Sequence, residues 1–186
     1  SNARMTALAR ARPNAANVSG ALKGSGKGPT VVLVHGLGGT ANGFARILFG
    51  LARRFERVLA VDLPGHGFSP EYCLGPVCVR GQYDVLVEYY RQVVGGPAFV
   101  VGNSLGGALS VILASVHPED VAALALVAPA GGEMTTTSLA ELMGALDVRT
   151  NADARRLTRR LFHRAPLLAI LFAPELKKMH ATPAVA

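Results

Sequence analysis

Short apolar runs alternate with amphipathic stretches through the first two thirds of the chain. Residues 31–34 are valine and leucine and end at a glycine-rich turn, which predicts a buried strand followed by a tight loop. Residues 41–54 carry apolar side chains at helical spacing, which predicts a helix. Further strands are predicted at 58–61, 98–101 and 121–127, further helices at 83–94 and 105–116, and one or two weak strands within 4–29. This alternation is typical of βαβ units, so the sequence predicts an α/β fold with a mostly parallel sheet and helices on both faces.

The pattern changes near residue 131. Beyond this point the chain offers no further strand candidate, and its apolar positions favour helices to the end. We therefore predict an α/β core over residues 4–130 and a helical cap segment over residues 131–186. Residues 1–3 (Ser-Asn-Ala) are interpreted as the remnant of an expression tag and are excluded from the fold.

Composition and charge narrow the class of protein. Half of the 186 residues are hydrophobic and 17% are charged, which suits one domain whose sheet is covered on both faces. No apolar run is long enough to span a bilayer, so no membrane span is expected. The net charge is +7, and its densest cluster, within residues 149–164, is interpreted as a solvated helix face. Because no aromatic platform or nucleic-acid motif accompanies it, no nucleic-acid partner is expected.

Cysteine usage and the N-terminus add little chemistry. Cys73 and Cys78 share one predicted loop and are interpreted as two reduced thiols, and no clustered histidine completes a zinc site. No metal and no organic cofactor is expected. No signal peptide is visible, although one could precede residue 1, and the cytoplasm is the favoured compartment.

The sharpest chemical signal lies between the strand at 98–101 and the helix at 105–116. There the chain reads Gly102-Asn103-Ser104-Leu105-Gly106, a G-x-S-x-G pattern at a strand-to-helix turn. Such a nucleophile elbow exposes the serine hydroxyl, and the N–H of the next residue points at a developing oxyanion. We therefore interpret Ser104 as a nucleophile and the Leu105 amide as one donor of an oxyanion hole.

A second glycine-rich turn follows the strand at 31–34. It reads His35-Gly36-Leu37-Gly38-Gly39, and the Leu37 amide is the candidate for the second oxyanion donor. His35 is interpreted as an anchor of the loop and not as a base. The residues expected to shape the site are His35, Gly36, Gly38, Asn103 and Gly106.

Three motifs in register carry a resemblance to a known family. They are VVLVHGLGG at 31–39, VDLPGHGFS at 61–69 and VVGNSLGGA at 100–108. Together they resemble the α/β-hydrolase superfamily, in particular its serine-nucleophile branch with a helical cap, which includes esterases, lipases and C–C bond hydrolases. The resemblance covers residues 30–130 well and the cap loosely. It implies hydrolysis of an ester, thioester or activated C–C bond of a small acyl substrate through an acyl-enzyme.

The family pattern is incomplete in this chain. The catalytic triad of such enzymes runs Ser, then Asp or Glu, then His, and the strands that would deliver the last two are not found before residue 186. We interpret the chain as truncated before the triad acid and histidine, leaving Glu133, His163 and His180 as weak candidates. The chain alone is therefore predicted to be nearly inactive. Strand 123–127, central in the family's sheet, becomes an exposed apolar edge that could pair with a second copy.

Two other functions compete with this interpretation. Gly36, Gly38 and Ala41 fit G-x-G-x-x-A between a strand and a helix, and Asp62 closes the next strand, as in a dinucleotide-binding fold. The serine elbow has no role in that scheme. A hydrolase-fold protein that binds a ligand without turnover is the remaining alternative.

Overall fold

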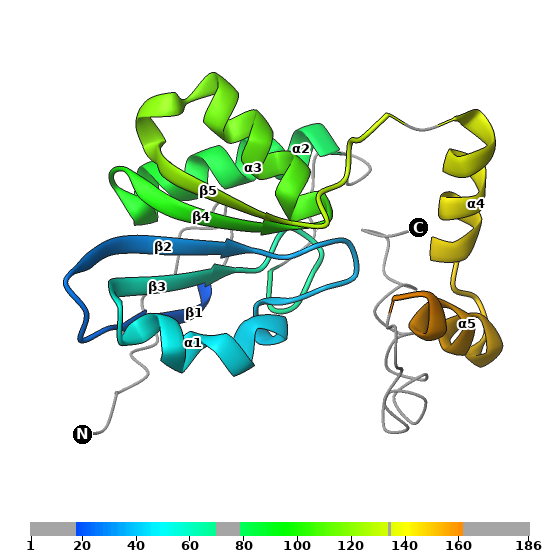
Figure 1. The fold of residues 1–186 in the computed structure, drawn as a ribbon, viewed down its shortest axis with the longest axis horizontal. Coiled ribbons are helices and arrows are strands. Elements are labelled where there is room, and N and C mark those ends of the chain that lie inside the picture. Colours follow the sequence, from blue (N-terminus) through cyan, green and yellow to red (C-terminus); the bar gives the residue numbers. More distant parts are fainter. Residues whose placement is uncertain (1–17, 70–78, 134, 162–186) are drawn as a thin grey trace. The chain divides into compact units, whose positions relative to one another are not determined.

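The computed structural model describes residues 18–69, 79–133 and 135–161 (Figure 1). The chain divides into two compact units, Ser1–Gly131 and Gly132–Ala186. The first unit holds a five-stranded sheet in the order β1-β3-β2-β4-β5. The strands are β1 (Val18–Lys23), β2 (Gly28–Val34), β3 (Phe55–Val61), β4 (Ala98–Asn103) and β5 (Val121–Val127). β1 runs antiparallel to β3, and all other neighbours are parallel.

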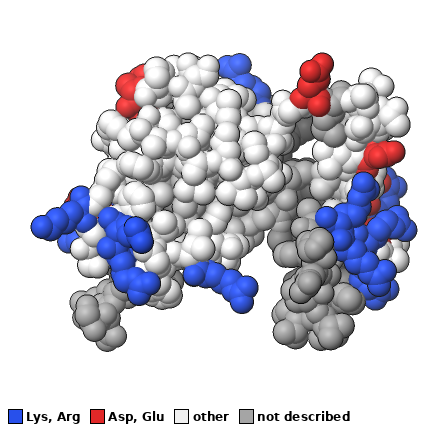
Figure 2. All heavy atoms as spheres, in the orientation of Figure 1, with Lys and Arg blue, Asp and Glu red and all other residues white. Residues whose placement is uncertain are grey.

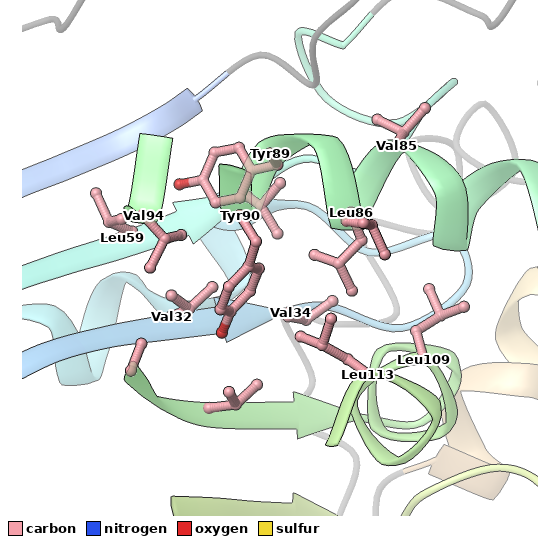
Figure 3. Close-up of a cluster of buried hydrophobic side chains, with 14 of the residues drawn as sticks. Val32, Val34, Leu59, Val85, Leu86, Tyr89, Tyr90, Val94, Leu109 and Leu113 are labelled. Atoms are coloured by element: carbon pink, nitrogen blue, oxygen red, sulfur yellow. The ribbon is translucent and has the colours of Figure 1, made fainter. Parts of the chain in front are cut away.

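Helices cover both faces of this sheet (Figure 1). Those of the first unit are η1 (Ala41–Phe44), α1 (Ala45–Ala52), α2 (Val79–Tyr89) with a π-helical turn η2 (Tyr90–Val94), α3 (Leu105–Val116) and η3 (Pro118–Asp120). Val31 and Leu33 of β2 lie in the core beneath α1, whereas Val32 and Val34 lie in the core beneath α2 and α3 (Figure 3). Alternate residues of one strand therefore fill two cores. The predicted α/β fold is confirmed.

Strand starts are the main difference from the predicted elements. β2 and β3 each begin three residues earlier than their apolar patterns indicate, at Gly28 and Phe55. In both strands the first three residues are exposed or half-buried, and only the last four are buried. Apolar periodicity reports burial, whereas the ladder of backbone hydrogen bonds continues beyond the core. The pattern therefore marks only the buried half of each strand.

The predicted helix over 83–94 is longer and less regular than expected. It begins at Val79 and ends in the π-helical turn η2. The Arg57 guanidinium, reaching over from β3, donates hydrogen bonds to the carbonyls of Val93 and Val94. These contacts satisfy carbonyls that a helix end leaves without partners.

β5 forms an edge of the described sheet, with β4 as its one strand neighbour there. The prediction of an exposed apolar edge at 123–127 is confirmed: Leu126 is 42% exposed and Val127 is 52% exposed. An edge strand of this kind offers unpaired backbone groups to another strand.

The described part of the second unit contains two helices, α4 (Thr136–Leu146) and α5 (Asn151–Leu161). α5 starts with a reciprocal cap: the Asp153 carboxylate accepts from the Thr150 N–H at 2.9 Å, and the Asp153 N–H donates to the Thr150 hydroxyl at 3.2 Å. One side of α5 packs against Val148. The other carries solvent-exposed Arg155, Arg156, Arg159 and Arg160, as predicted for a solvated helix face. Among the described residues, no helix is long and apolar enough to cross a bilayer.

Candidate active site

Ser104 occupies a sharp bend between β4 and α3. Its backbone has φ 50° and ψ −118°, a left-handed conformation that non-glycine residues adopt rarely and at a cost of about 1–3 kcal/mol. The residue is half-buried and belongs to neither the strand nor the helix. This is the geometry predicted for a nucleophile elbow.

Backbone hydrogen bonds from a distant segment hold this bend in place. The Ser104 N–H donates to the Val127 carbonyl at 3.0 Å, and the Ser104 carbonyl accepts from the Ala130 N–H at 3.0 Å. The Asn103 side-chain amide also donates to the Val127 carbonyl, at 3.2 Å. Residues 127–130 thus fix the elbow from both sides. Ala128 within this segment has a φ of 43°, a second strained position beside the first.

Glycines make the bend sterically possible. A Cβ added to Gly106 would collide with the backbone carbonyls of Val34 and His35, and one added to Gly102 would lie 2.6 Å from the Ser110 hydroxyl. Neither position therefore accommodates a side chain. These contacts explain why the G-x-S-x-G turn carries glycine at both positions.

The loop after β2 lies directly against the elbow. A Cβ on Gly36 would lie only 2.8 Å from the Cβ of Ser104. The loop is closed by a hydrogen bond from the Gly39 N–H to the Gly36 carbonyl at 2.9 Å, and Gly38 adopts a φ of 66°. Among the described residues, no acceptor is bonded to the amides of Leu37 or Leu105. Leu37 directly follows Gly36, and Leu105 directly follows Ser104. Two N–H donors without an acceptor among the described residues therefore lie next to the contact between the loop and the elbow.

His35 and His66 anchor this loop as neutral imidazoles. Each donates its Nδ1–H to a nearby carbonyl, His35 to Gly36 at 2.7 Å and His66 to Pro64 at 2.9 Å. Each Nε2 accepts a backbone N–H, from Leu63 at 3.0 Å for His35 and from Gly38 at 3.1 Å for His66. An Nε2 that accepts a hydrogen bond carries no proton.

Electrostatics keep His35 uncharged. Burial lowers its pKa to about 4, an effect strengthened by His66 and opposed by the hydrogen bond to Gly36 and by the Asp62 carboxylate. A buried neutral imidazole whose two nitrogens are both bonded is a structural anchor. The interpretation of His35 as an anchor agrees with this geometry.

Asp62 ties three loop segments together. Its side chain accepts hydrogen bonds from the Ala41 N–H at 2.7 Å and the Phe68 N–H at 3.0 Å, and its backbone carbonyl accepts from the Ser69 hydroxyl at 2.6 Å. The residue is 1% exposed. Both carboxylate oxygens are thus engaged by this chain's own backbone, which does not fit the ribose-binding role required by the dinucleotide alternative.

The other predicted candidates are not part of this group of contacts in the first unit. His163, His180, Cys73 and Cys78 lie outside them. Glu133 is an exposed residue of the second unit. His117 caps the C-terminal end of α3, twelve helical residues and so about 18 Å of helix rise from the elbow.

One group of described residues has the composition of a metal site. His117, Glu119 and Asp120 bring one ligand atom each within 4.8 Å of one another at the end of α3 remote from Ser104. His117 already contacts the Glu119 carboxylate at 3.6 Å. In the described part of the chain, no further metal-ligating side chain joins these three, so no metal role is assigned.

Sequence reasoning missed the segment that holds the elbow. The predicted strand ended correctly at Val127, but no pattern indicated that Val127 and Ala130 would bond to Ser104. Pro129 indicates a turn after the strand, but a proline does not indicate which distant residue the turn will bond to.

Comparison with known proteins shows the family of the chain. The α/β hydrolase fold family matches residues 29–185, and the chain therefore belongs to that family. An esterase of Mycobacterium tuberculosis is 38% identical over 107 residues, covering 58% of this chain and 35% of the esterase. A pimeloyl-[acyl-carrier protein] methyl ester esterase of Chromobacterium violaceum is 44% identical over 103 residues, covering 55% of this chain and 38% of that protein.

Solved structures show the same fold. A bacterial membrane phospholipase A superposes with a TM-score of 0.74 at 27% identity, covering 90% of this chain and 58% of that one. A 2-hydroxy-6-oxo-6-phenylhexa-2,4-dienoate hydrolase from Rhodococcus gives a TM-score of 0.71 at 25% identity, covering 89% and 63%. The chain thus matches between a third and two fifths of the length of each of the two curated esterases described above.

Proposed function

We propose that Ser104 is the nucleophile of a hydrolase that cleaves a carboxylic ester through an acyl-enzyme. The observation that carries the proposal is the left-handed bend at Ser104, which sets the hydroxyl between a strand end and the first residue of α3. A thioester or an activated C–C bond next to a carbonyl would react by the same chemistry.

The proposed reaction begins with attack of the Ser104 Oγ on the substrate carbonyl carbon. The hydroxyl proton passes to a base, and the carbonyl oxygen becomes an oxyanion. The N–H groups of Leu37 and Leu105 are proposed to donate to that oxygen, helped by the positive N-terminal end of α3. Collapse of the intermediate expels the alcohol, which takes up a proton, and water then hydrolyses the acyl-Ser104 ester.

The described histidines do not supply the base. The Nε2 atoms of His35 and His66 accept backbone N–H groups, and His117 lies at the far end of α3. A serine hydroxyl without a base is a weak nucleophile at neutral pH. His163 and His180 lie outside the described residues. We propose that neither acts as the base, so that the 186-residue chain alone hydrolyses esters very slowly.

The names of some relatives support an ester as the substrate. The two curated relatives are named as esterases, and the phospholipase A is named for cleavage of a phospholipid ester. We propose by analogy that this chain acts on an acyl ester of small size. The helices of the second unit are proposed to form the cap that selects it.

A second part of the proposal concerns self-association. Within the described residues, β4 is the one strand that pairs with β5, whose other edge exposes Leu126 and Val127, and strand edges of this kind pair with other strands. We propose that two copies of the chain associate through this edge.

A cysteine variant tests the elbow without requiring a base. In Ser104→Cys the thiol would sit at the N-terminus of α3, where the helix dipole and the unused amides favour the thiolate. We expect its pKa, measured from the pH dependence of alkylation by iodoacetamide, to fall below the ordinary thiol value. Peptide mapping by mass spectrometry separates this site from Cys73 and Cys78.

Ser115→Cys is the matched control, because Ser115 is an exposed residue near the C-terminal end of the same helix. Its thiol should not show a lowered pKa, since that end of the dipole disfavours an anion. Equal pKa values for the two variants, or a raised value at position 104, would contradict the proposed oxyanion-stabilising site.

A further inference from the structure

One side of α1 exposes large apolar side chains to solvent. Phe49 is 67% exposed and Ile47 is 45% exposed, whereas Leu48 and Leu51 pack on the core beneath the helix. Ile47 and Phe49 are two positions apart, so they lie on the two flanks of the exposed side of the helix, and each adds a large apolar side chain to it. Neither is needed to hold the helix on the sheet.

Arginines accompany these apolar side chains. Arg46 and Arg53 lie three and four positions on either side of Phe49, which places all three on one side of the helix, and Arg54 follows directly. All three arginines are exposed. We define Arg46, Ile47, Phe49, Arg53 and Arg54 as the α1 surface.

Two lysines extend the positive charge. The turn between β1 and β2 packs against the C-terminal end of α1, since the Ser25 N–H donates to the Ala52 carbonyl at 2.8 Å and the Gly28 N–H to the Arg54 carbonyl at 3.1 Å. Lys23 and Lys27 flank this turn and are exposed. Figure 2 shows Lys and Arg side chains gathered along this border of the unit.

These cations have almost no acidic counterpart. Among the described residues, none of the three arginines or the two lysines forms an ion pair, and Glu56 is the exposed acid beside the turn. By contrast, the exposed arginines of α2 and of the following turn η2 each pair with an acid of α2, Arg80 with Asp84 and Arg91 with Glu88. An anionic partner would therefore meet unneutralised charge at the α1 surface.

The combination of apolar and basic side chains discriminates between anionic partners. A helix that lies on a lipid surface buries apolar side chains at the boundary of headgroups and acyl chains while Arg and Lys contact phosphates. Nucleic acids and acidic proteins need the charge but give Phe49 and Ile47 no apolar environment of this kind. The rival basic face, on α5, exposes arginines with no large apolar side chain among its described neighbours.

We propose that the α1 surface, with Lys23 and Lys27 at its border, docks the chain peripherally on anionic phospholipid bilayers. Phe49 and Ile47 enter the interfacial region, and the cations contact lipid phosphates. This docking depends on neither Ser104 nor the proposed hydrolysis, so the two proposals fail separately.

Co-sedimentation of the full chain with lipid vesicles tests the docking. We expect binding to phosphatidylcholine vesicles that contain phosphatidylglycerol and little binding to phosphatidylcholine alone. Because each Lys or Arg near an anionic surface contributes about 1 kcal/mol, the double variant Arg53→Glu/Arg54→Glu should lower the partition coefficient at least about 25-fold. Phe49→Ser should lower it independently of salt, since its contribution is apolar.

Matched controls separate this surface from others. Val111→Ser removes a comparably exposed apolar side chain from α3, and Arg155→Glu/Arg159→Glu reverses two charges on α5; both should leave binding unchanged. Circular dichroism should show every variant folded. Equal binding to neutral vesicles, loss of binding only in the α5 variant, or DNA binding as tight as vesicle binding and insensitive to Phe49→Ser would each overturn the proposal.

Discussion

Gly36 and Ser104 lie so close that a Cβ on the glycine would fall 2.8 Å from the Cβ of the serine. The loop after β2 and the elbow after β4 therefore meet at one point. β2 and β4 are paired in parallel, and Val34 is in register with Gly102. Both loops therefore begin at the carboxyl ends of their strands, at the same end of the sheet. The parallel register brings together Gly36 and Ser104, which are 68 positions apart in the sequence.

Two helical glycines should respond oppositely to the same substitution. In Gly106→Ala the new methyl group would meet the carbonyls of Val34 and His35, and overpacking of this kind costs about 1–3 kcal/mol or more. In Gly50→Ala nothing lies within 4 Å, so the gain in helix propensity should stabilise the protein by about 0.5–1 kcal/mol. Urea denaturation measures both, and a stabilised Gly106→Ala variant would refute the close contact between α3 and β2.

Acid should destabilise the fold through His35. The pKa of His35 is lowered from 6.5 to about 4 in the folded protein, so between these values the unfolded chain binds the proton and the folded chain does not. The stability is therefore complete above pH 6.5 and declines as the pH falls toward 4, by up to about 3 kcal/mol. The measurement is the free energy of unfolding at a series of pH values.

The control for this titration is His35→Gln. We expect the variant to be less stable at every pH, because the glutamine amide forms poorer hydrogen bonds with the Leu63 N–H and the Gly36 carbonyl than the imidazole does. However, the variant lacks the titrating ring. Its stability should therefore vary less between pH 6.5 and 4. An equally steep decline in the variant would assign the acid sensitivity to another group.

Catalysis by the chain alone should be barely detectable. Loss of a triad member lowers kcat by about 10⁴–10⁶, and the described histidines offer Ser104 no base. With p-nitrophenyl butyrate we expect nearly equal rates for the 186-residue chain and for Ser104→Ala. Turnover of about 1 per second or faster that disappears in Ser104→Ala would disprove the inactivity and support Ser104 as the nucleophile.

Self-association should depend on the free edge of β5. A charged side chain on an edge strand opposes strand pairing, so Leu126→Lys should reduce any concentration-dependent dimer seen by sedimentation velocity. Val111→Lys, at a similarly exposed position of α3, should have no effect. A monomer at all concentrations, or a dimer that persists in Leu126→Lys and dissociates in Val111→Lys, would exclude β5 as the interface.

The sequence predicted most of the first unit because its strands carry strong burial signals. It located the buried halves of β2 and β3 but not their exposed starts at Gly28 and Phe55, which backbone pairing alone defines. It located Ser104 because a G-x-S-x-G turn requires glycines at fixed positions. It gave no sign of the bonds from residues 127–130, since any residue can offer a backbone N–H or carbonyl.

The bend at Ser104 also constrains when the elbow can form during synthesis. Its N–H and carbonyl are held by Val127 and Ala130, more than twenty residues closer to the C-terminus. A nascent chain whose β5 is still inside the ribosomal tunnel has β4 and the serine but not the hydrogen bonds that hold the strained conformation. The elbow of this chain is therefore completed only after β5 and the three residues that follow it have emerged from the ribosome.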